Sequence, residues 1–230
     1  MSSSDASMRR YYATRAPYYD DVYEKPERSE DIACLKAWLP KAFAGHRVLE
    51  VACGTGYWTQ FIAPSAAAMT ATDATAQPLE IARGREGSRG VRFELADAYA
   101  LPESLGTYDA AFAGLWLSHV PIGRRGEFLA SLHARLAPGA RVVLIDNADV
   151  QCRELPIAER DDEGNTFQHR RLKDGSVHRV LKNFPTQVEL EGMIAGLGTQ
   201  PAYRQLQNFW LFEYKDRRRP PETTPGTKPA

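Results

Sequence analysis

Two glycines and an acidic residue around one apolar run are the residues of this chain best placed to bind a ligand. Residues 48–56 read Val-Leu-Glu-Val-Ala-Cys-Gly-Thr-Gly, so Glu50 precedes Gly54 and Gly56 by a few positions. An apolar run that stops at paired glycines is typical of a buried parallel strand that turns into a helix beside a nucleotide-like ligand. Because glycine has no Cβ, Gly54 and Gly56 can adopt backbone angles closed to other residues and let a ligand lie on the main chain.

The residues around these glycines favour a sulfonium nucleoside over a dinucleotide. A dinucleotide fingerprint needs a third small residue for close packing of the helix on the strand, and Thr59 takes that place here. Glu50 would repel a pyrophosphate but would attract a cationic ligand or a donor-rich amino group. The pattern therefore disfavours a dehydrogenase.

Residues 50–56 resemble motif I of the class I S-adenosylmethionine-dependent methyltransferases, and two further acids follow at predicted strand ends. Asp73 comes 17 residues after Gly56, and Asp97 follows the next strand. A carboxylate at the first position can accept both ribose hydroxyl hydrogens. The resemblance implies S-adenosylmethionine as the cofactor, with Asp97 accepting the adenine amino group and the Ala98 amide facing the ring. Each acid could instead cap the helix that follows it.

The loop after the fourth predicted strand contains the candidates for the methyl acceptor's side of the site. Transfer from a sulfonium needs an aligned acceptor, exclusion of water and, for some acceptors, removal of a proton, but no metal. His119 could act as a general base or hydrogen-bond donor, and Trp116 could form a wall of the pocket. A packed histidine and a core aromatic residue are the alternatives. DNA amine methylases carry Asn or Asp, two prolines and an aromatic residue at this strand end, which argues against base methylation.

Five tyrosines lie between residues 11 and 23, and Arg28 follows them. The resemblance implies an N-terminal helix that closes over the cofactor, with a tyrosine that lines the methyl-transfer channel. We take Tyr19 as the candidate for a catalytic role, although Pro17 interrupts the periodicity that would identify the inward-facing tyrosine.

These residues need a scaffold in which strand ends meet at one edge, and the predicted elements supply it. Strands and helices alternate, which builds a parallel sheet with helices on both faces, a Rossmann-like α/β fold. The methyltransferase fold ends with a helix and an antiparallel strand pair, so we expect a seven-stranded mixed sheet. The predicted strands are 47–51, 68–72, 91–95, 108–115, 141–146, 202–206 and 208–215, and the predicted helices are 27–39, 57–65, 76–86, 123–136 and 186–197.

Residues 147–185 resemble an insertion before the last helix, which in this family commonly covers the acceptor pocket. The insertion contains the strongest hairpin signal of the chain, Asp174-Gly175. A two-residue turn there would place four potential cations on one face, through the pairs Arg171 with His178, His169 with Val180, and Phe167 with Lys182. Turned inward, Arg171, His178 and Lys182 would bind an anionic acceptor such as a carboxylate or phosphonate; turned outward, they would form a solvated edge.

The sequence beside and within this insertion narrows the resemblance and the expected function. Residues 114–121, 171–175 and 180–182 resemble a subgroup of small-molecule O-methyltransferases that includes the phosphonate methyltransferase of dehydrophos biosynthesis. We therefore predict transfer of a methyl group from S-adenosylmethionine to an oxygen or nitrogen of a small anionic or aromatic molecule. C-methylation of a quinone-like ring, and cofactor binding without transfer, are the alternatives.

The composition sets bounds on the whole molecule. A chain of 230 residues with 43% apolar content suffices for one α/β domain, which we expect at 9–216. We expect disorder at 1–8 and at 217–230, because the second segment is rich in Pro, Thr and charge. Equal numbers of basic and acidic residues, 29 of each, do not favour nucleic acid as a partner.

The remaining signals concern disulfides, metals and membranes. The three cysteines are widely spaced and suggest neither a disulfide framework nor a zinc site. The polar N-terminus has no signal-peptide core, and the chain has no apolar run long enough to span a bilayer. We expect a soluble cytoplasmic protein without metal or membrane partners; the oligomeric state stays open.

Overall fold

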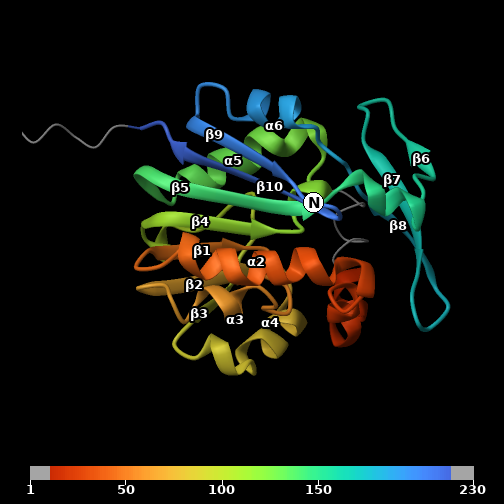
Figure 1. Cartoon of the computed structure of the whole chain (residues 1–230), viewed down its shortest axis with the longest axis horizontal. Helices are drawn as coiled ribbons and strands as arrows, with labels where there is room; N and C mark the ends of the chain where they lie inside the picture. Colours follow the sequence, from red (N-terminus) through yellow and green to blue (C-terminus); the bar gives the residue numbers. More distant parts are fainter. Residues whose placement is uncertain (1–10, 219–230) are drawn as a thin grey trace, which may run out of the picture.

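The computed structural model describes residues 11–218 and has a seven-stranded sheet at its centre (Figure 1). The strands follow the order β3-β2-β1-β4-β5-β10-β9. Strands β1 to β5 run parallel to one another, whereas β10 is antiparallel to both β5 and β9, so the sheet is mixed as predicted. The bounds are Arg47–Val51 for β1, Ala68–Asp73 for β2, Arg92–Leu95 for β3, Tyr108–Gly114 for β4, Leu136–Asn147 for β5, Gly198–Gln205 for β9 and Phe209–Asp216 for β10.

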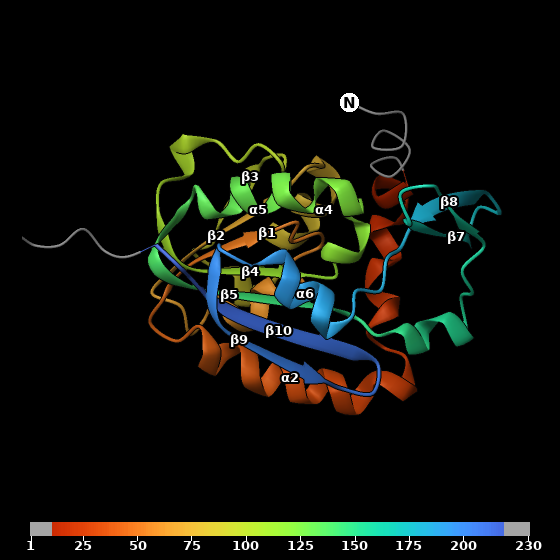
Figure 2. The same ribbon diagram turned by 90° about the horizontal axis from the view of Figure 1, so that it is seen from above.

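Helices cover both faces of this sheet because successive side chains of a strand point to opposite faces. In β1, Val48 packs in one core cluster with α2 and α3, and Leu49 packs in another with α5 and α6. Figure 2 shows α2 and α5 on opposite sides of the sheet. The α-helices are α2 (Ser29–Ala42), α3 (Thr59–Ile62), α4 (Ala76–Arg83), α5 (Arg125–His133) and α6 (Gln187–Met193).

All the predicted strands and helices occur, with shifts at their ends. The predicted strand 47–51 coincides with β1, whereas the predicted helix 57–65 shortens to α3 because residues 54–58 form the turn that leads into it. Strand β5 starts earlier than predicted, at Leu136. Gly139 adopts a φ of 77° within it, which lets the strand bend near the point where its register with β4 shifts.

The insertion after β5 forms a small sheet of its own beside the main one (Figure 1). The hairpin of β7 and β8 is the predicted one, and the two-residue strand β6 was not predicted. Because the insertion follows the carboxyl end of β5, it stands at the edge where the ends of the parallel strands meet. Its elements are η7 (Asp149–Arg153), β6 (Glu159–Arg160), β7 (Thr166–Arg171) and β8 (Val177–Leu181), in the sheet order β6-β7-β8.

The turn of this hairpin has three residues rather than two, and this corrects the predicted pairing. Two backbone hydrogen bonds close the loop 172–176, and Gly175 adopts a left-handed φ of 86°. His178 therefore lies opposite Arg170 instead of Arg171. A shift of one residue moves every side chain of a strand to the other face. The predicted pairs of Arg171 with His178, His169 with Val180, and Phe167 with Lys182 are wrong.

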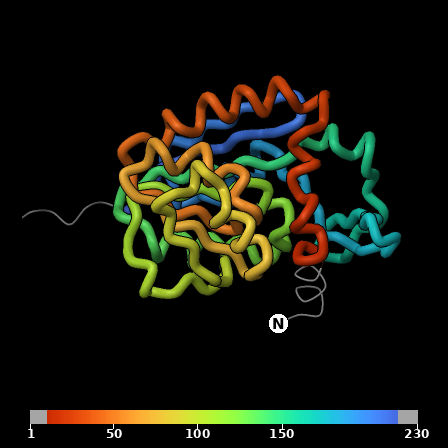
Figure 3. The backbone as a smooth tube through the Cα atoms, turned by 90° about the horizontal axis from the view of Figure 1, so that it is seen from below, coloured from red at the N-terminus to blue at the C-terminus, as the bar shows by residue number. Residues whose placement is uncertain are grey.

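The N-terminal segment lies between the main sheet and the insertion (Figure 3). It comprises a helical stretch at residues 11–15 and the 3-10 helices η1 (Ala16–Val22) and η2 (Pro26–Arg28). On one side Tyr23 stacks on Tyr57, with ring centroids 3.6 Å apart. On the other side the Lys173 ammonium of the hairpin loop donates to Asp21 at 2.9 Å. The segment therefore contacts both parts of the molecule.

The predicted domain ends need one correction. The segment 1–8 and residues 219–230 lie outside the described residues. Arg218 is held in place, because its guanidinium donates to the carbonyls of His133 and Leu136 at 2.6 and 2.7 Å. The ordered chain thus extends past the predicted boundary at residue 216. Within the described range, no helix is long and apolar enough to cross a membrane.

Candidate active site

The carboxyl ends of β1 to β4 surround a cavity of about 490 Å³, which we call the first cavity. It lies at the edge of the sheet where the sequence places its candidate residues. The turn after β1, the ends of β2 and β3, the loop after β4 and the N-terminal segment all contribute to its wall. Seven of the predicted site residues line it, namely Tyr19, Gly54, Asp73, Asp97, Ala98, Trp116 and His119.

The turn after β1 brings main chain directly to this cavity. Gly54 has a φ of 56°, and a Cβ built on it would meet nothing within 4 Å, so open space lies above the glycine. Ala52 has a φ of 55°, a left-handed conformation that costs a residue with a Cβ about 1–2 kcal/mol. Strain of this kind persists where the surrounding structure enforces it, most often at functional sites. The backbone here is shaped for close approach of a ligand.

Glu50 and Gly56 lie behind this turn, which corrects their predicted contact with the cofactor. Glu50 is 1% exposed and accepts a hydrogen bond from the Thr59 hydroxyl at 2.5 Å. Burial raises the pKa of Glu50 to about 8, so the group is mainly protonated at neutral pH and offers no charge to a cationic ligand. A Cβ on Gly56 would lie 2.7 Å from the Cβ of Ala82 in α4. Both residues therefore shape the turn from behind.

Asp73 and Asp97 face the first cavity from the ends of β2 and β3. Asp73 accepts hydrogen bonds from the Gly54 N–H at 3.0 Å and from the Thr75 hydroxyl at 2.7 Å. Burial raises the pKa of Asp73, and these hydrogen bonds oppose the rise. Asp97 accepts from the Tyr99 N–H at 3.0 Å. The two carboxylates are placed as a ribose and an adenine amino group would require, and these roles stay predictions.

Aromatic rings form another wall of the first cavity. Trp116 and Tyr99 line it with ring centroids 6.0 Å apart, and the Arg124 guanidinium lies 3.6 Å from the centroid of Tyr99. Trp116 follows Leu115, whose φ of 57° turns the chain sharply after β4. Trp116 was predicted as a wall of the acceptor's pocket, but it lines the first cavity and not the smaller second cavity beside it.

A second cavity of about 290 Å³ lies among the N-terminal segment, η7 and the hairpin. Four residues line both cavities, namely Tyr12, Tyr19, Leu115 and His119. The cavities therefore adjoin at these residues, which we call the junction. A methyl group that passes from a ligand in the first cavity to a ligand in the second must cross there.

Lys182 is the most deeply buried cation of the second cavity. It is 1% exposed and donates to the Ser118 hydroxyl at 2.7 Å and to the Asp146 carboxylate at 2.9 Å. Burial lowers the pKa of Lys182 to about 8, although the Asp146 carboxylate opposes this effect. Burial alone would raise the pKa of Asp146, but the Lys182 ammonium helps to hold it below its ordinary value. The pair is therefore ionised at neutral pH.

Arg170 supplies a second buried cation to this wall. Its guanidinium donates twice to the Gln168 amide oxygen, at 2.7 and 3.2 Å. No carboxylate oxygen of residues 11–218 lies within 4.0 Å of it. A buried charge without a counter-ion is unfavourable, and a bound anion would relieve that cost.

His119 is fixed at the junction in one tautomer. Its Nδ1 lies 2.6 Å from the Leu181 carbonyl oxygen, which can only accept, so Nδ1 carries the proton. Its Nε2 therefore accepts from the Tyr12 hydroxyl at 2.7 Å. Burial, together with Lys182 and Arg170, lowers the pKa of His119 well below its ordinary value. The imidazole is neutral and presents an acceptor nitrogen.

Tyr19 also lines both cavities, which agrees with its predicted place beside the transferred methyl. The Arg15 guanidinium lies 4.9 Å from the centroid of its ring. Burial raises the pKa of Tyr19, so its hydroxyl stays protonated at neutral pH. A neutral phenol can donate a hydrogen bond at the junction.

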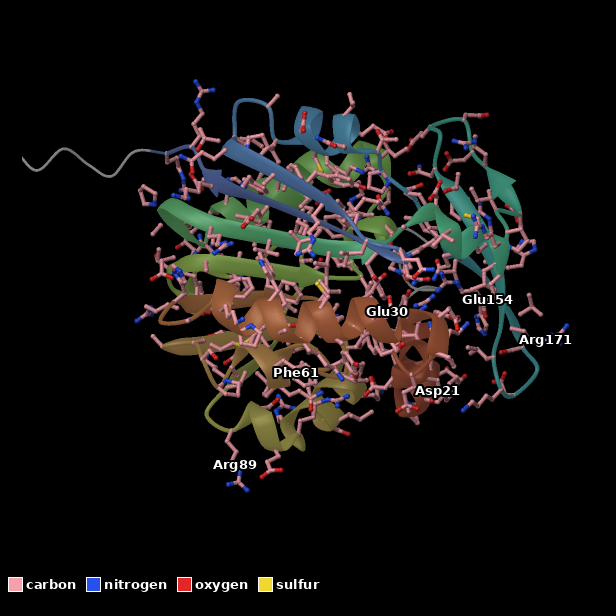
Figure 4. The ribbon with its side chains drawn as sticks, viewed as in Figure 1. Asp21, Glu30, Phe61, Arg89, Glu154 and Arg171 are labelled. Atoms are coloured by element: carbon pink, nitrogen blue, oxygen red, sulfur yellow. The ribbon has the colours of Figure 1, made fainter. Side chains whose placement is uncertain are left out.

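The two other predicted anion-binding residues are not buried in the site: Arg171 lines the second cavity but is exposed, and His178 lines neither cavity. Arg171 donates to the Gly175 carbonyl at 2.9 Å, and Figure 4 shows it pointing away from the sheet at the outer side of the hairpin. The Nε2 of His178 lies 2.8 Å from the Ser176 hydroxyl. Of the predicted trio only Lys182 is buried in the wall.

Sequence reasoning missed Arg170 and Tyr12. Arg170 is the neighbour of the predicted Arg171, so the error lies in the register of the hairpin and not in the segment. A predicted three-residue loop, with Gly175 in the left-handed position, would have placed Arg170 on the same face as Lys182. Tyr12 belongs to the tyrosine-rich segment, but sequence alone did not indicate which ring reaches His119.

Comparisons with known proteins connect this geometry to a family. A family model described as "Methyltransferase domain" matches residues 48–139. The chain is 33% identical over 108 residues to Methyltransferase GfsG of Streptomyces halstedii and 34% identical over 122 residues to O-methyltransferase cnsE of Penicillium expansum. These matches cover 45% and 50% of this chain but only 38% and 44% of those two proteins. A demethylmenaquinone methyltransferase of Thermus thermophilus is 29% identical over 78% of this chain and 82% of its own length.

Solved structures extend the similarity to almost the whole chain. The DhpI–SAH complex superposes with a TM-score of 0.75 and 30% identity, covering 93% of this chain and 97% of that one. The DhpI–SAM–HEP complex gives a TM-score of 0.77 at the same identity and covers 99% of that chain. Both superpositions cover a larger share of this chain than any of the three sequence matches.

Proposed function

The chain belongs to the class I S-adenosylmethionine-dependent methyltransferases, and we propose that it moves the methyl group of this cofactor to an oxygen or nitrogen of a small anionic acceptor. Because members of this family bind S-adenosylmethionine, we assign the first cavity to this cofactor. The proposal concerns the acceptor, and the single observation that supports it is the buried, unneutralised cation Arg170 beside Lys182 in the second cavity.

The first cavity fits the cofactor in both shape and chemistry. The open space above Gly54 lets an adenosyl group or its amino acid tail lie on the main chain. Asp73 would accept the ribose hydroxyls, Asp97 the adenine amino group, and Ala98 would face the ring. When bound there, the cofactor supplies an electrophilic methyl on a positively charged sulfur.

The second cavity would hold the acceptor so that its nucleophilic atom meets the junction. Charged hydrogen bonds from Arg170 and Lys182 would bind an anionic group there. An anionic oxygen needs no deprotonation before it attacks, so His119 would act chiefly by holding the Tyr12 hydroxyl in place. The walls of the two cavities would exclude water from the reacting atoms. In the similar DhpI structure SAM and HEP are bound together, which is consistent with two adjoining sites.

A turnover screen tests this proposal. Purified protein is incubated with S-adenosylmethionine and matched pairs of acceptors, each an anionic compound and its uncharged ester or amide, and S-adenosylhomocysteine is measured. We expect turnover with anionic members and little with their partners. Equal turnover of both members of each pair would contradict the proposal.

Three relatives described as demethylmenaquinone methyltransferases support a second candidate function. The Thermus thermophilus protein is a demethylmenaquinone methyltransferase, which favours carbon methylation of a quinone-like ring. Such a ring offers no anionic group of the kind that Arg170 and Lys182 would bind. Adding a demethylated naphthoquinol to the same screen separates the two functions, and binding of the cofactor without any turnover would indicate a cofactor-binding protein.

A further inference from the structure

Arg28 lines the second cavity, and nothing in the proposed methyl transfer uses it. It belongs to η2, is 4% exposed and lies in the same wall as Asn147 and Gln151. The junction residues make none of its hydrogen bonds. A buried guanidinium in this position needs a reason, because Arg is charged at every physiological pH and is costly to bury.

The described part of the protein gives the Arg28 guanidinium only weak hydrogen bonds. One nitrogen, Nη1, donates to the Val22 carbonyl at 3.2 Å and to the Asn147 side-chain oxygen at 3.3 Å, both long distances for hydrogen bonds of a charged group. Over the described part of the chain, no carboxylate oxygen lies within 4.0 Å of Arg28. Its guanidinium carbon lies 5.5 Å from the ring centroid of Phe209, which offers only a weak attraction.

Among the described residues, two acidic side chains line the second cavity, Asp21 and Glu154, and Asp21 forms an ion pair with Lys173. Glu154 forms an ion pair with Lys25. Figure 4 labels Glu154 beside the N-terminal segment. Asp146, the counter-ion of Lys182, hydrogen-bonds to Ser118, Lys182 and Asn147 and makes no hydrogen bond to Arg28. Burial lowers the pKa of Arg28, and Glu154 and Glu27 oppose this shift. Neither carboxylate lies within 4.0 Å of the guanidinium, so direct contact with an anionic group is open to a ligand.

A polar neighbour strengthens the case for a ligand group at this position. Gln151 is buried, and its amide nitrogen donates to Asn147 at 3.2 Å. Its amide oxygen has no hydrogen-bond partner among the residues that the structure describes. The guanidinium of Arg28 favours an anionic group at this position, and the free amide oxygen of Gln151, which can only accept, would suit a hydrogen-bond donor on the same ligand.

We propose that Arg28 binds a second anionic group of the acceptor, so that the acceptor is a small molecule with two anionic groups. One group lies at Arg170 and Lys182 and receives the methyl, while the other lies at Arg28 and orients the molecule. This inference rests on the proposed function, since it assumes that the second cavity holds the acceptor. Arg28 is then a specificity-determining residue.

Calorimetric titration with two probes tests this assignment without relying on turnover. Phosphonoacetate and phosphonoacetamide share a phosphonate and differ only in whether the second group is charged. We expect the wild-type protein, saturated with S-adenosylhomocysteine, to bind phosphonoacetate about tenfold or more tightly than the amide, the effect of one charged hydrogen bond. Arg28→Gln should bind the two probes alike, and Arg28→Lys should keep part of the preference because it keeps the charge.

The matched control is Arg89→Gln, because Arg89 is exposed and Figure 4 shows it far from the insertion. This variant should keep the full preference. Affinity for S-adenosylhomocysteine and the midpoint of thermal unfolding report whether each variant is folded. If Arg28→Gln weakens both probes by the same factor, Arg28 shares the first anionic group and the inference is wrong; it is equally wrong if neither affinity changes.

Failure of the proposed function would give a different result. In that case wild-type protein would bind neither phosphonate and would show no preference for anionic acceptors in the turnover screen. Methylation of a simple phosphonate, together with an unchanged probe preference in Arg28→Gln, would leave the proposed function in place and remove only the second group.

Discussion

Charge separates the residues of the site into two groups. The carboxylates Asp73 and Asp97 face the first cavity, whereas the cations Arg170 and Lys182 face the second. A positively charged sulfonium nucleoside and an anionic acceptor would therefore each meet the opposite charge. The two ligands would also attract each other across the junction, which favours the approach that methyl transfer needs.

Arg170 and its neighbour Arg171 provide a direct test of the observed hairpin register. Arg170→Gln should raise KM for an anionic acceptor by about 10- to 100-fold, the loss expected for a buried charged hydrogen bond. Arg171→Gln should change KM little, since that side chain is exposed. Cofactor affinity, measured by calorimetry, should be nearly the same in both variants. A larger increase in KM for Arg171→Gln than for Arg170→Gln would indicate that the hairpin has the predicted two-residue turn in solution.

Lys182 predicts the pH dependence of acceptor binding. The Lys182 amine must be protonated to bind an anion, and it loses this proton as the pH rises through about 8. We therefore expect kcat/KM for the acceptor to fall above about pH 8, since this ratio reports the free enzyme. The Lys182→Met variant should have a low kcat/KM for the acceptor, and its pH profile should lack the fall above about pH 8. A wild-type profile that stays flat through this range would contradict the assignment.

Glu50 predicts a pH dependence of stability instead. Its pKa is raised from 4.5 to about 8, so the folded protein binds more protons than the unfolded chain between these values, and stability is lost as the pH rises through them. The loss should reach about 3–5 kcal/mol and should be absent in Glu50→Gln, as measured by denaturant unfolding across this pH range. Cofactor affinity of the variant at neutral pH should be unchanged. A large loss of affinity would place Glu50 in the site after all.

The turn between β1 and α3 shows how an element can give two glycines different roles. Gly56 packs against α4, and Gly54 borders open space. Gly56→Ala should lower the free energy of unfolding by about 2–5 kcal/mol, through overpacking and a left-handed φ. Gly54→Ala should cost about 1–2 kcal/mol for its φ alone but should weaken cofactor binding more. The reverse order of cofactor affinities would contradict the geometry.

The length of the hairpin loop decides which side chains of β7 and β8 face the second cavity. Because the loop has one residue more than predicted, Arg170 and Lys182 are buried together in the wall of this cavity, while Arg171, which also lines it, stays exposed. The position of the insertion after β5 was readable from the chain, and its register was not. Turn type therefore decides which residues of the hairpin can contact an acceptor.

In the whole molecule, the N-terminal segment couples the two cavities. Asp20 accepts hydrogen bonds from the Thr55 hydroxyl at 2.7 Å and from Arg85, and Thr55 lines the first cavity. The same segment supplies Tyr12 and Tyr19 to the junction. Contacts of Asp20 therefore hold this segment, which we call the cover, against the wall of the first cavity.

Asp20→Ala should loosen the cover and speed release of the cofactor product. We expect the dissociation rate of S-adenosylhomocysteine to rise about three- to tenfold, because the partly exposed contacts of Asp20 contribute about 1 kcal/mol. Stopped-flow fluorescence can follow the release. Asp21→Ala is the control, since within residues 11–218 Asp21 forms its ion pair with the exposed Lys173 and not with the wall of the first cavity. Equal rates in the two variants would show that Asp20 does not hold the cover.

The sequence alone determined the fold class and the cofactor, and it identified several residues that line the first cavity. Strand and helix periodicity are local properties. The glycine turn and the acid at the end of each strand can likewise be recognised from short stretches of sequence. This is why Gly54, Asp73 and Asp97 were correctly placed at the cavity. Glu50 and Gly56 belong to the same motif, but whether a residue faces the ligand or backs the turn depends on helix packing that spacing does not encode.

Only the tertiary structure decided the composition of the second cavity. Its wall joins η2 to the end of β5, η7 and the hairpin, which come more than a hundred positions later in the chain. No local pattern specifies that Arg28 and Arg170 share a cavity, or that Tyr12 reaches His119 across it. Burial set the remaining properties, because desolvation lowers the pKa values of Lys182 and His119 only after the surrounding elements have packed around them.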